Sequence, residues 1–198
     1  MEEIKRAIVS IPFLIGLLVC TMAGLTGVIY DLPYGEGSGA NYLFRCFHSL
    51  ISILPLLAPV IATIPFANSY ASERNSGFSK FIMQRLPVSS YKAAKLISNA
   101  LAGGLVLAIP LTGAFLWFTI KYPIVPKPYT ISGAFGELFT TNPIAYMWIL
   151  IGLSFLFGAT FATIGLAFSV LFSNQFFANI LPLVVYIDSA EKVSQKVP

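Results

Sequence analysis

Four stretches of this chain are each long and apolar enough to cross a lipid bilayer. About 20 apolar residues in a helix span the roughly 30 Å hydrocarbon core. The stretches that meet this length are residues 8–30, 47–70, 93–120 and 143–172. Each must be helical, because lipid offers no hydrogen-bond partner to backbone NH and CO groups. A fifth stretch, residues 176–187, is only about 12 residues long, which predicts either a truncated span or a half-inserted helix.

The composition excludes an ordinary water-facing surface. Hydrophobic residues make up 57% of the chain and charged residues only 10%, against about 25% charged residues in an average soluble protein. The apolar residues are spread along the whole length, so we expect one transmembrane domain over residues 1–198 and no soluble domain. The predicted fold class is therefore an all-α polytopic membrane protein.

Basic residues predict how the chain is oriented in the membrane. The segment after the second stretch carries five of them against one acid, Glu73, and such segments lie in the cytoplasm. These residues are Arg74, Lys80, Arg85, Lys92 and Lys95. The basic N-terminus then lies inside and loops 31–46 and 121–142 outside, which predicts a multi-pass protein of the cell (plasma) membrane with a cytoplasmic N-terminus. The net charge of +4 is explained by these cytoplasmic basic residues. We therefore expect no nucleic acid as a partner.

The sequence contains none of the familiar catalytic or metal-binding motifs. His48 is the one histidine and has no second metal-ligand type beside it. Cys20 and Cys46 form no ligand cluster. No acid pair within the apolar stretches supports an intramembrane enzyme, so we expect a protein that is not an enzyme. No ionisable residue falls at mid-depth either, which disfavours an ion-coupled carrier.

Several prolines lie within the apolar stretches. A proline removes a helical hydrogen bond, so each is either a hinge or a static kink. The prolines are Pro55, Pro59, Pro65, Pro110 and Pro182.

In the fourth stretch Ser154, Gly158 and Ala162 recur every four residues and Gly165 continues this face of small residues. Such a face lets helices approach closely, either within the molecule or at a subunit interface.

The cytoplasmic segment over residues 71–92 has an amphipathic pattern. Phe78, Phe81, Ile82 and Leu86 fall on one helical face, which predicts a short helix along the inner membrane surface. Pro87 ends the pattern, and Tyr91 and Lys92 lead into the third stretch. Composition alone favours an ordinary interfacial helix here.

The segment also resembles the corresponding part of ABC-2 type ABC transporter permeases. The matching residues are Ser72, Glu73, Arg74, Gly77, Phe81, Arg85, Pro87, Val88, Ser89, Tyr91, Lys92 and Lys95. The resemblance implies an ABC-2 type (type V exporter-like) helical bundle with a cytoplasmic coupling helix between the second and third spans. That family normally has six spans, whereas the stretches described above make four and part of a fifth.

The same resemblance implies partners and site residues. The permease would pair with a second copy or a sister permease and dock on separate ATP-binding cassette subunits, which would hold the ATP and Mg. No cofactor would bind this chain directly. The ATPase-coupling residues would be Glu73, Arg74, Gly77, Phe78, Phe81, Arg85 and Pro87. No residue is assigned to the substrate.

The expected function is therefore that of a transmembrane permease subunit in an ATP-driven exporter. Spans rich in Phe, Leu, Ser and Thr and without mid-depth charge suit an amphipathic or hydrophobic substrate such as a peptide. Two alternatives stay open. One is a membrane scaffold or immunity protein that transports nothing, and the other is an ion-coupled secondary carrier.

Overall fold

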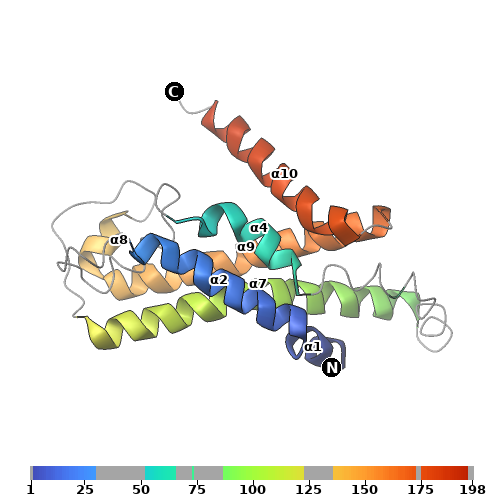
Figure 1. Cartoon of the computed structure of the whole chain (residues 1–198), viewed down its shortest axis with the longest axis horizontal. Coiled ribbons are helices and arrows are strands. Elements are labelled where there is room, and N and C mark those ends of the chain that lie inside the picture. The colour runs from blue at the N-terminus through green and yellow to red at the C-terminus, as the bar shows by residue number, and fades with distance from the viewer. Residues whose placement is uncertain are drawn as a thin grey trace.

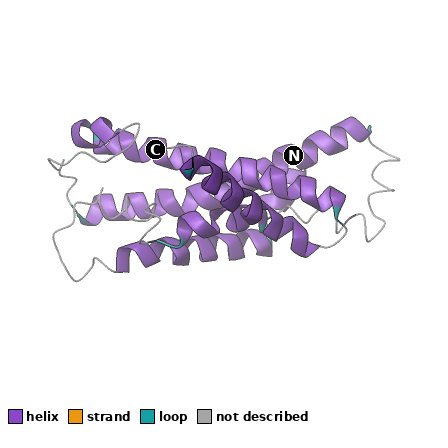
Figure 2. Cartoon of the chain, turned by 90° about the horizontal axis from the view of Figure 1, so that it is seen from above, coloured by secondary structure: helices purple, strands orange, loops and turns teal. Residues whose placement is uncertain are grey.

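The computed structural model describes residues 2–29, 52–65, 73, 87–122, 136–172 and 175–195. These residues are almost all helical, and no strand occurs among them (Figure 2). The helices are α1 (Glu2–Ile8), α2 (Ile11–Ile29), α4 (Leu54–Thr63), α7 (Val88–Lys121), α8 (Gly136–Thr141), α9 (Pro143–Leu171) and α10 (Gln175–Ser194).

Two of these helices, α7 and α9, are long and apolar enough to cross a membrane. They contain the predicted stretches 93–120 and 143–172 almost unchanged. Asn142 explains why α9 begins where it does, because its side chain accepts a hydrogen bond from the backbone NH of Ala145 at 3.2 Å and Pro143 follows at the first helical position. The described structure is consistent with an all-α membrane protein.

Helix α2 begins at Ile11, three residues after the start of the predicted span over residues 8–30, and a separate short helix, α1, precedes it. The break falls at Val9 and Ser10. The Ser10 hydroxyl donates to the carbonyl of Ala7 at 3.1 Å and accepts from the NH of Phe13 at 3.2 Å. One side chain therefore closes α1 and caps α2. Pro12 lies in the first turn of α2, where its missing NH costs nothing.

The second stretch is described only over residues 52–65, and its helix α4 has ten residues. Pro55 lies at the start of this helix and Pro65 lies beyond its end, so neither is the mid-helix kink that the sequence suggested. Pro59 is inside α4, as Pro110 is inside α7 and Pro182 inside α10. A proline in the first turn suits a helix, because the NH of that residue has no intrahelical acceptor.

The last helix is longer than its apolar sequence. The predicted apolar stretch covers only residues 176–187, whereas α10 continues through the polar residues to Ser194. Asp188 and Lys192 form an ion pair at 2.5 Å across one turn of this polar part. The short helix α8, in the loop over residues 121–142, was also not predicted.

Helices α7 and α9 form the centre of the bundle and run in opposite directions (Figure 1). Small residues bring them together, since a Cβ on Gly103 would lie 2.3 Å from that of Ala162, and a Cβ on Gly158 would lie 2.3 Å from the carbonyl oxygen of Gly103. Gly158, Ala162 and Gly165 are all buried. The small face of the fourth stretch therefore packs within the molecule, as one of the two sequence readings predicted.

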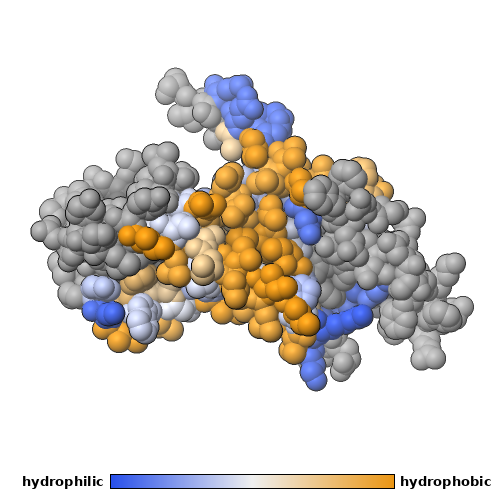
Figure 3. Space-filling view, in the orientation of Figure 1, coloured by the Kyte–Doolittle hydropathy of each residue, from blue (hydrophilic) through white to orange (hydrophobic). Residues whose placement is uncertain are grey.

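The remaining helices flank this pair. Helix α2 lies beside α7 and runs in the same direction, α4 packs against α9, α2 and α7, and α10 leaves the bundle at an angle (Figure 1). Hydrophobic side chains cover the middle of the face seen in Figure 3, and hydrophilic ones gather near the C-terminal end of α10 and near the N-terminus. This banding places the polar residues of α1 and of the start of α7 at one end of the bundle.

Candidate functional site: a buried charge cluster and an apolar cavity

One face of α7 changes character along its length. Its first turns bury the polar residues Tyr91, Lys95, Ser98 and Asn99, and the face then continues with Ala102. These positions recur three or four residues apart, so they share one side of the helix. An ordinary membrane helix would bury apolar residues here, and a buried lysine requires a partner.

Glu73 supplies that partner. Its carboxylate accepts hydrogen bonds from the Tyr91 hydroxyl at 2.6 Å, the Lys95 ammonium at 2.7 Å and the Arg6 guanidinium at 3.0 Å. Lys95 is also 2.9 Å from a carboxylate oxygen of Glu3. The cluster thus joins three parts of the chain, which are α1, the residue Glu73 and the first two turns of α7.

Among the described residues, the charges in this cluster balance. Two carboxylates, Glu3 and Glu73, face two cations, Arg6 and Lys95. Glu73 is only 5% exposed and Lys95 2%, so their mutual attraction acts in a low dielectric and offsets the cost of removing them from water. Three donors on one carboxylate also satisfy its lone pairs, which is the condition under which a buried ion pair is tolerated.

The cluster is covered by α1. The side chain of Arg6 is 57% exposed and that of Glu3 is 24% exposed, whereas those of Glu73 and Lys95 are almost sealed. Displacing α1 would therefore expose Glu73 and Lys95 to water and weaken their pairing. The geometry links the position of α1 to the electrostatic environment of α7.

Of the seven residues predicted to contact an ATPase, the structure describes two. Glu73 lies in the cluster and faces into the bundle, and Pro87 precedes α7 in an extended, exposed conformation. Arg74, Gly77, Phe78, Phe81 and Arg85 lie outside the described residues, as does most of the amphipathic segment. Their role in coupling stays a prediction.

Sequence reasoning did not assign Glu3, Arg6, Tyr91 or Lys95 to a site. It treated Lys95 and Arg6 as orientation signals and Tyr91 as part of a motif. A usable signal was present, since Tyr91 and Lys95 are four residues apart and are continued by Ser98 and Asn99 on the same face. A polar stripe on an otherwise apolar helix predicts a buried partner of opposite charge.

The polar stripe continues one turn further. The Asn99 side-chain NH₂ donates to the backbone carbonyl of Ala162 at 2.6 Å, which ties α7 to α9. Among the described residues, the Ser98 hydroxyl and the Asn99 side-chain oxygen have no hydrogen-bond partner although both residues are 1% exposed. Such buried polar atoms are uncommon in proteins.

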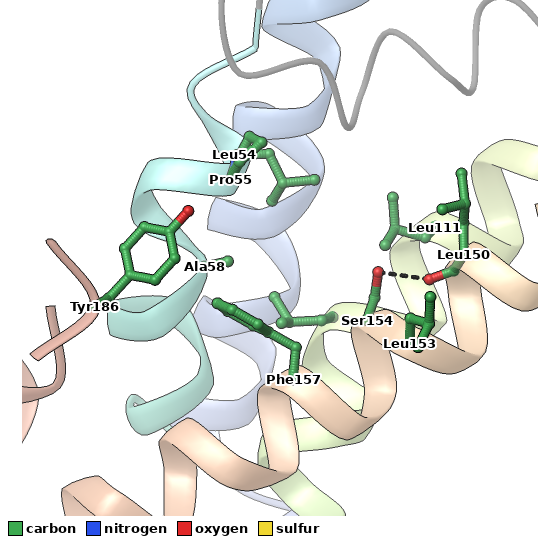
Figure 4. Close-up of a pocket in the computed structure, with 10 residues that line it drawn as sticks. Leu54, Pro55, Ala58, Leu111, Leu150, Leu153, Ser154, Phe157 and Tyr186 are labelled. Carbon is green, nitrogen blue, oxygen red and sulfur yellow. Dashed lines mark hydrogen bonds between the residues drawn. The ribbon is translucent and has the colours of Figure 1, made fainter. Parts of the chain in front are cut away.

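A second feature is an apolar pocket of about 220 Å³ that lies between α4, α7, α9 and α10 and is open on one side (Figure 4). Its polar atoms are few. The Ser154 hydroxyl already donates to the carbonyl of Leu150 at 2.8 Å, and the Tyr186 ring stacks edge-on against Phe157. The lining residues are Leu54, Pro55, Ala58, Leu107, Leu111, Leu150, Leu153, Ser154, Phe157 and Tyr186. The cavity suits an apolar group.

The described residues contain no group of three His, Cys, Asp or Glu side chains that could hold a metal ion. Glu3 and Glu73 approach each other only through Lys95, and a lysine ammonium between two carboxylates occupies the place that a cation would take. What the cluster can do is hold helices together and respond to displacement of one of them.

Comparison with known proteins yields no relative. The chain matches no protein-family model, no curated protein and no solved structure.

Proposed function

We propose that this chain is the multi-pass transmembrane permease subunit of an ATP-driven ABC exporter in the cell membrane. The sequence support is the segment from Ser72 to Lys95 with its resemblance to ABC-2 permeases. The structural observation that carries the proposal is the binding of Glu73 by Arg6, Tyr91 and Lys95. Glu73, near the start of the proposed coupling segment, is thereby held by two helices of the bundle, α1 and α7.

The proposed mechanism is mechanical. ATP and Mg bind to separate ATP-binding cassette subunits, and the closing of those subunits moves the coupling segment. The movement passes through Glu73 to α1 and to the first turns of α7 as a rigid-body displacement. In this mechanism Glu73 is a positioning residue, while the ATPase contacts are made by other residues of the predicted set. A second copy or a sister permease completes the transporter.

The proposed substrate is an amphipathic or hydrophobic molecule such as a peptide. Support comes from the cavity between α4, α7, α9 and α10, which has about 220 Å³ and offers only the Ser154 and Tyr186 hydroxyls among apolar side chains. Apolar pockets with few polar groups bind apolar ligands or apolar side chains of larger ones. A small hydrated ion would find no ligands there.

The first test is to tag the chain in its native membrane, solubilise it gently and identify the proteins that co-purify. We expect a P-loop ATPase whose activity rises when the permease is present. A purification that retains other membrane complexes but no ATPase would contradict the proposal.

The second test asks whether Glu73 couples the two subunits. In the double variant Glu73→Leu with Lys95→Met, apolar side chains replace the buried pair. We expect the complex to assemble but the stimulation of ATPase activity and the export to be lost. Asp188→Asn is the matched control, because it removes an exposed ion pair of α10. Normal export by the double variant would remove Glu73 from the mechanism.

An ion-coupled carrier is the second candidate, and the buried Glu73 and Lys95 pair is the observation that favours it. Carriers place ionisable groups near the bilayer centre. Lys95 instead lies in the second turn of a 34-residue helix, which is why the exporter is preferred. Purified protein in vesicles distinguishes the two, since a carrier moves substrate when an ion gradient is imposed without ATP, and a non-transporting scaffold moves none.

A further inference from the structure

A groove of about 690 Å³ runs between α2 and α7, further along α7 than the Glu73 cluster. Its walls are apolar along most of their length, with Leu17 and Leu25 from α2 and Ala114 and Phe118 from α7. The Thr21 hydroxyl donates to the carbonyl of Leu17 at 2.7 Å, so it presents no free donor. The volume lies within the range of about 300–1,000 Å³ that is typical of ligand pockets.

The α7 wall of the groove has a glycine in its middle, so no side chain fills the space there. Gly113 has no side chain, and nothing lies within 4 Å of the place that its Cβ would take. Pro110, one turn before it, also lines the groove. Bulkier residues at these positions would fill the space, so the hollow is a product of the sequence.

One end of the groove carries a positive charge and aromatic rings. Lys121 lines this end, and its ammonium lies 5.5 Å from the centre of the Trp117 ring. Among the described residues, Lys121 forms no ion pair. Tryptophan, tyrosine and lysine at a helix end are typical of the boundary between lipid headgroups and hydrocarbon, and Tyr122 completes the set at this end.

The length of the groove agrees with one lipid leaflet. Lys121 and Pro110 are eleven residues apart on α7, which is about 16 Å at 1.5 Å per residue. One leaflet is half of the roughly 30 Å hydrocarbon core. A chain that starts beside Lys121 would therefore extend to the middle of the bilayer along the apolar walls.

From this charge and shape complementarity we infer that the groove between α2 and α7 binds an anionic phospholipid, with its phosphate at Lys121 and an acyl chain along Gly113. The inference rests on the membrane location proposed above and not on the transport function. It also goes beyond that function, because the lipid is a resident ligand rather than a transported substrate.

The two tryptophans of the chain provide the test. Trp148→Phe leaves Trp117 in the groove, and Trp117→Phe leaves Trp148 on α9 as a reference. Each variant is placed in phosphatidylcholine vesicles that contain a small share of a lipid with brominated chains, either phosphatidylglycerol or phosphatidylcholine. Bromine quenches tryptophan fluorescence on contact.

We expect brominated phosphatidylglycerol to bind at Trp117 with about a fivefold preference over brominated phosphatidylcholine, which is what one lysine beside an anionic headgroup supports. Lys121→Gln should abolish this preference, whereas Lys192→Gln on the exposed part of α10 should preserve it. An equal preference at Trp117 and Trp148, or a preference that survives Lys121→Gln, would overturn the inference.

The acyl-chain part of the inference has its own variant. Gly113→Leu should fill the groove and reduce the quenching of Trp117 by either lipid at least twofold. Gly152→Leu on α9 is the matched control, since the space around Gly152 is also open. Unchanged quenching in the Gly113 variant would overturn the inference. So would quenching of Trp148 without any quenching of Trp117, because that result would indicate that a second copy of the chain covers the groove.

The same experiment distinguishes a wrong membrane location from a wrong lipid site. If neither tryptophan is quenched by any brominated lipid, the chain does not lie in the bilayer, and both the proposed location and the lipid site fall. If Trp148 and Trp117 are quenched without preference, the location stands and only the site falls. The ATPase experiments are independent of either result.

Discussion

Helix α7 is held at two places by opposite means. In its first turns, Tyr91 and Lys95 bind Glu73 through directional, charge-assisted contacts. Further along, Gly103 and Gly104 lie so close to α9 that there is no room for a side chain. Charged contacts can be broken and remade as parts move, whereas close packing has essentially one arrangement. The comparison indicates that the start of α7 is the adjustable end and its middle is the fixed one.

Removing the carboxylate of the cluster should have the largest effect on stability. Among the described residues, Glu73→Ala leaves the buried Lys95 with the carboxylate of Glu3, and breaking a buried ion pair costs about 3–5 kcal/mol. Unfolding in a mixed micelle with increasing denaturing detergent measures the change. The control is Asp188→Asn, which breaks an exposed pair and should cost under about 1 kcal/mol. Equal losses in the two variants would show that burial of the cluster contributes nothing.

A single added methyl group should break the fixed contact. In Gly158→Ala the new Cβ would lie 2.3 Å from the backbone oxygen of Gly103, so the two helices must move apart. We expect a loss of about 1–3 kcal/mol in the free energy of unfolding. Gly152→Ala on the same helix has open space around it and should be neutral or stabilising by up to about 1 kcal/mol, because alanine favours the helix. Identical stability of the two variants would contradict the close packing.

The hydrogen bond of Asn99, which lies on α7 between the charge cluster and the glycine contact, should contribute less to stability than either of them. Asn99→Leu removes the hydrogen bond to the carbonyl of Ala162, and interhelical hydrogen bonds in membrane proteins average about 0.6 kcal/mol. The same change also removes a buried oxygen that has no partner among the described residues, which offsets part of the loss. Detergent unfolding should therefore show a net change below about 1 kcal/mol. A loss as large as that of Glu73→Ala would mean that the polar stripe is one cooperative network.

The smallest effect is expected when both buried charges are replaced. Glu73→Leu with Lys95→Met leaves Arg6, which is exposed, and Glu3, which is partly exposed, and it removes the bond of the Tyr91 hydroxyl to Glu73. Replacing a buried ion pair by apolar residues is often neutral, so we expect stability close to that of the parent chain. A double variant as unstable as Glu73→Ala would show that the cluster is needed for folding itself, and not only for the proposed coupling.

The sequence was a good guide to the helices whose environment is uniform. Residues 93–120 and 143–172 lie within or closely match α7 and α9, because a long apolar run has one solution in lipid. The sequence was a poorer guide where a single side chain determines the point at which a helix begins or ends. Ser10 separates α1 from α2 near the start of the first stretch by hydrogen bonding to both helices, and hydropathy counts it only as one mildly polar residue among apolar neighbours.

The charge cluster could be predicted only in part. Glu73 was singled out from a motif, but its partners Arg6 and Tyr91 are 67 and 18 residues away along the chain. Pairing over such distances depends on how α1 folds back against α7, which periodicity does not report. The spacing of Tyr91, Lys95 and Asn99 shows that they share one face of a helix. Which carboxylate lies opposite that face can be seen only in the tertiary structure.

Two of the three lysines of α7, Lys95 and Lys121, limit how the helix can adapt to its membrane. Lys95 and Lys121 are 26 residues apart, about 39 Å at 1.5 Å per residue, and the hydrocarbon core is only about 30 Å thick. A helix with this hydrophobic mismatch tilts, or the bilayer thickens around it. Lys95 is held by Glu73 and Glu3 and cannot extend toward water as a free lysine would. Bilayer thickness therefore acts directly on the tilt of α7, and through it on the geometry at Glu73.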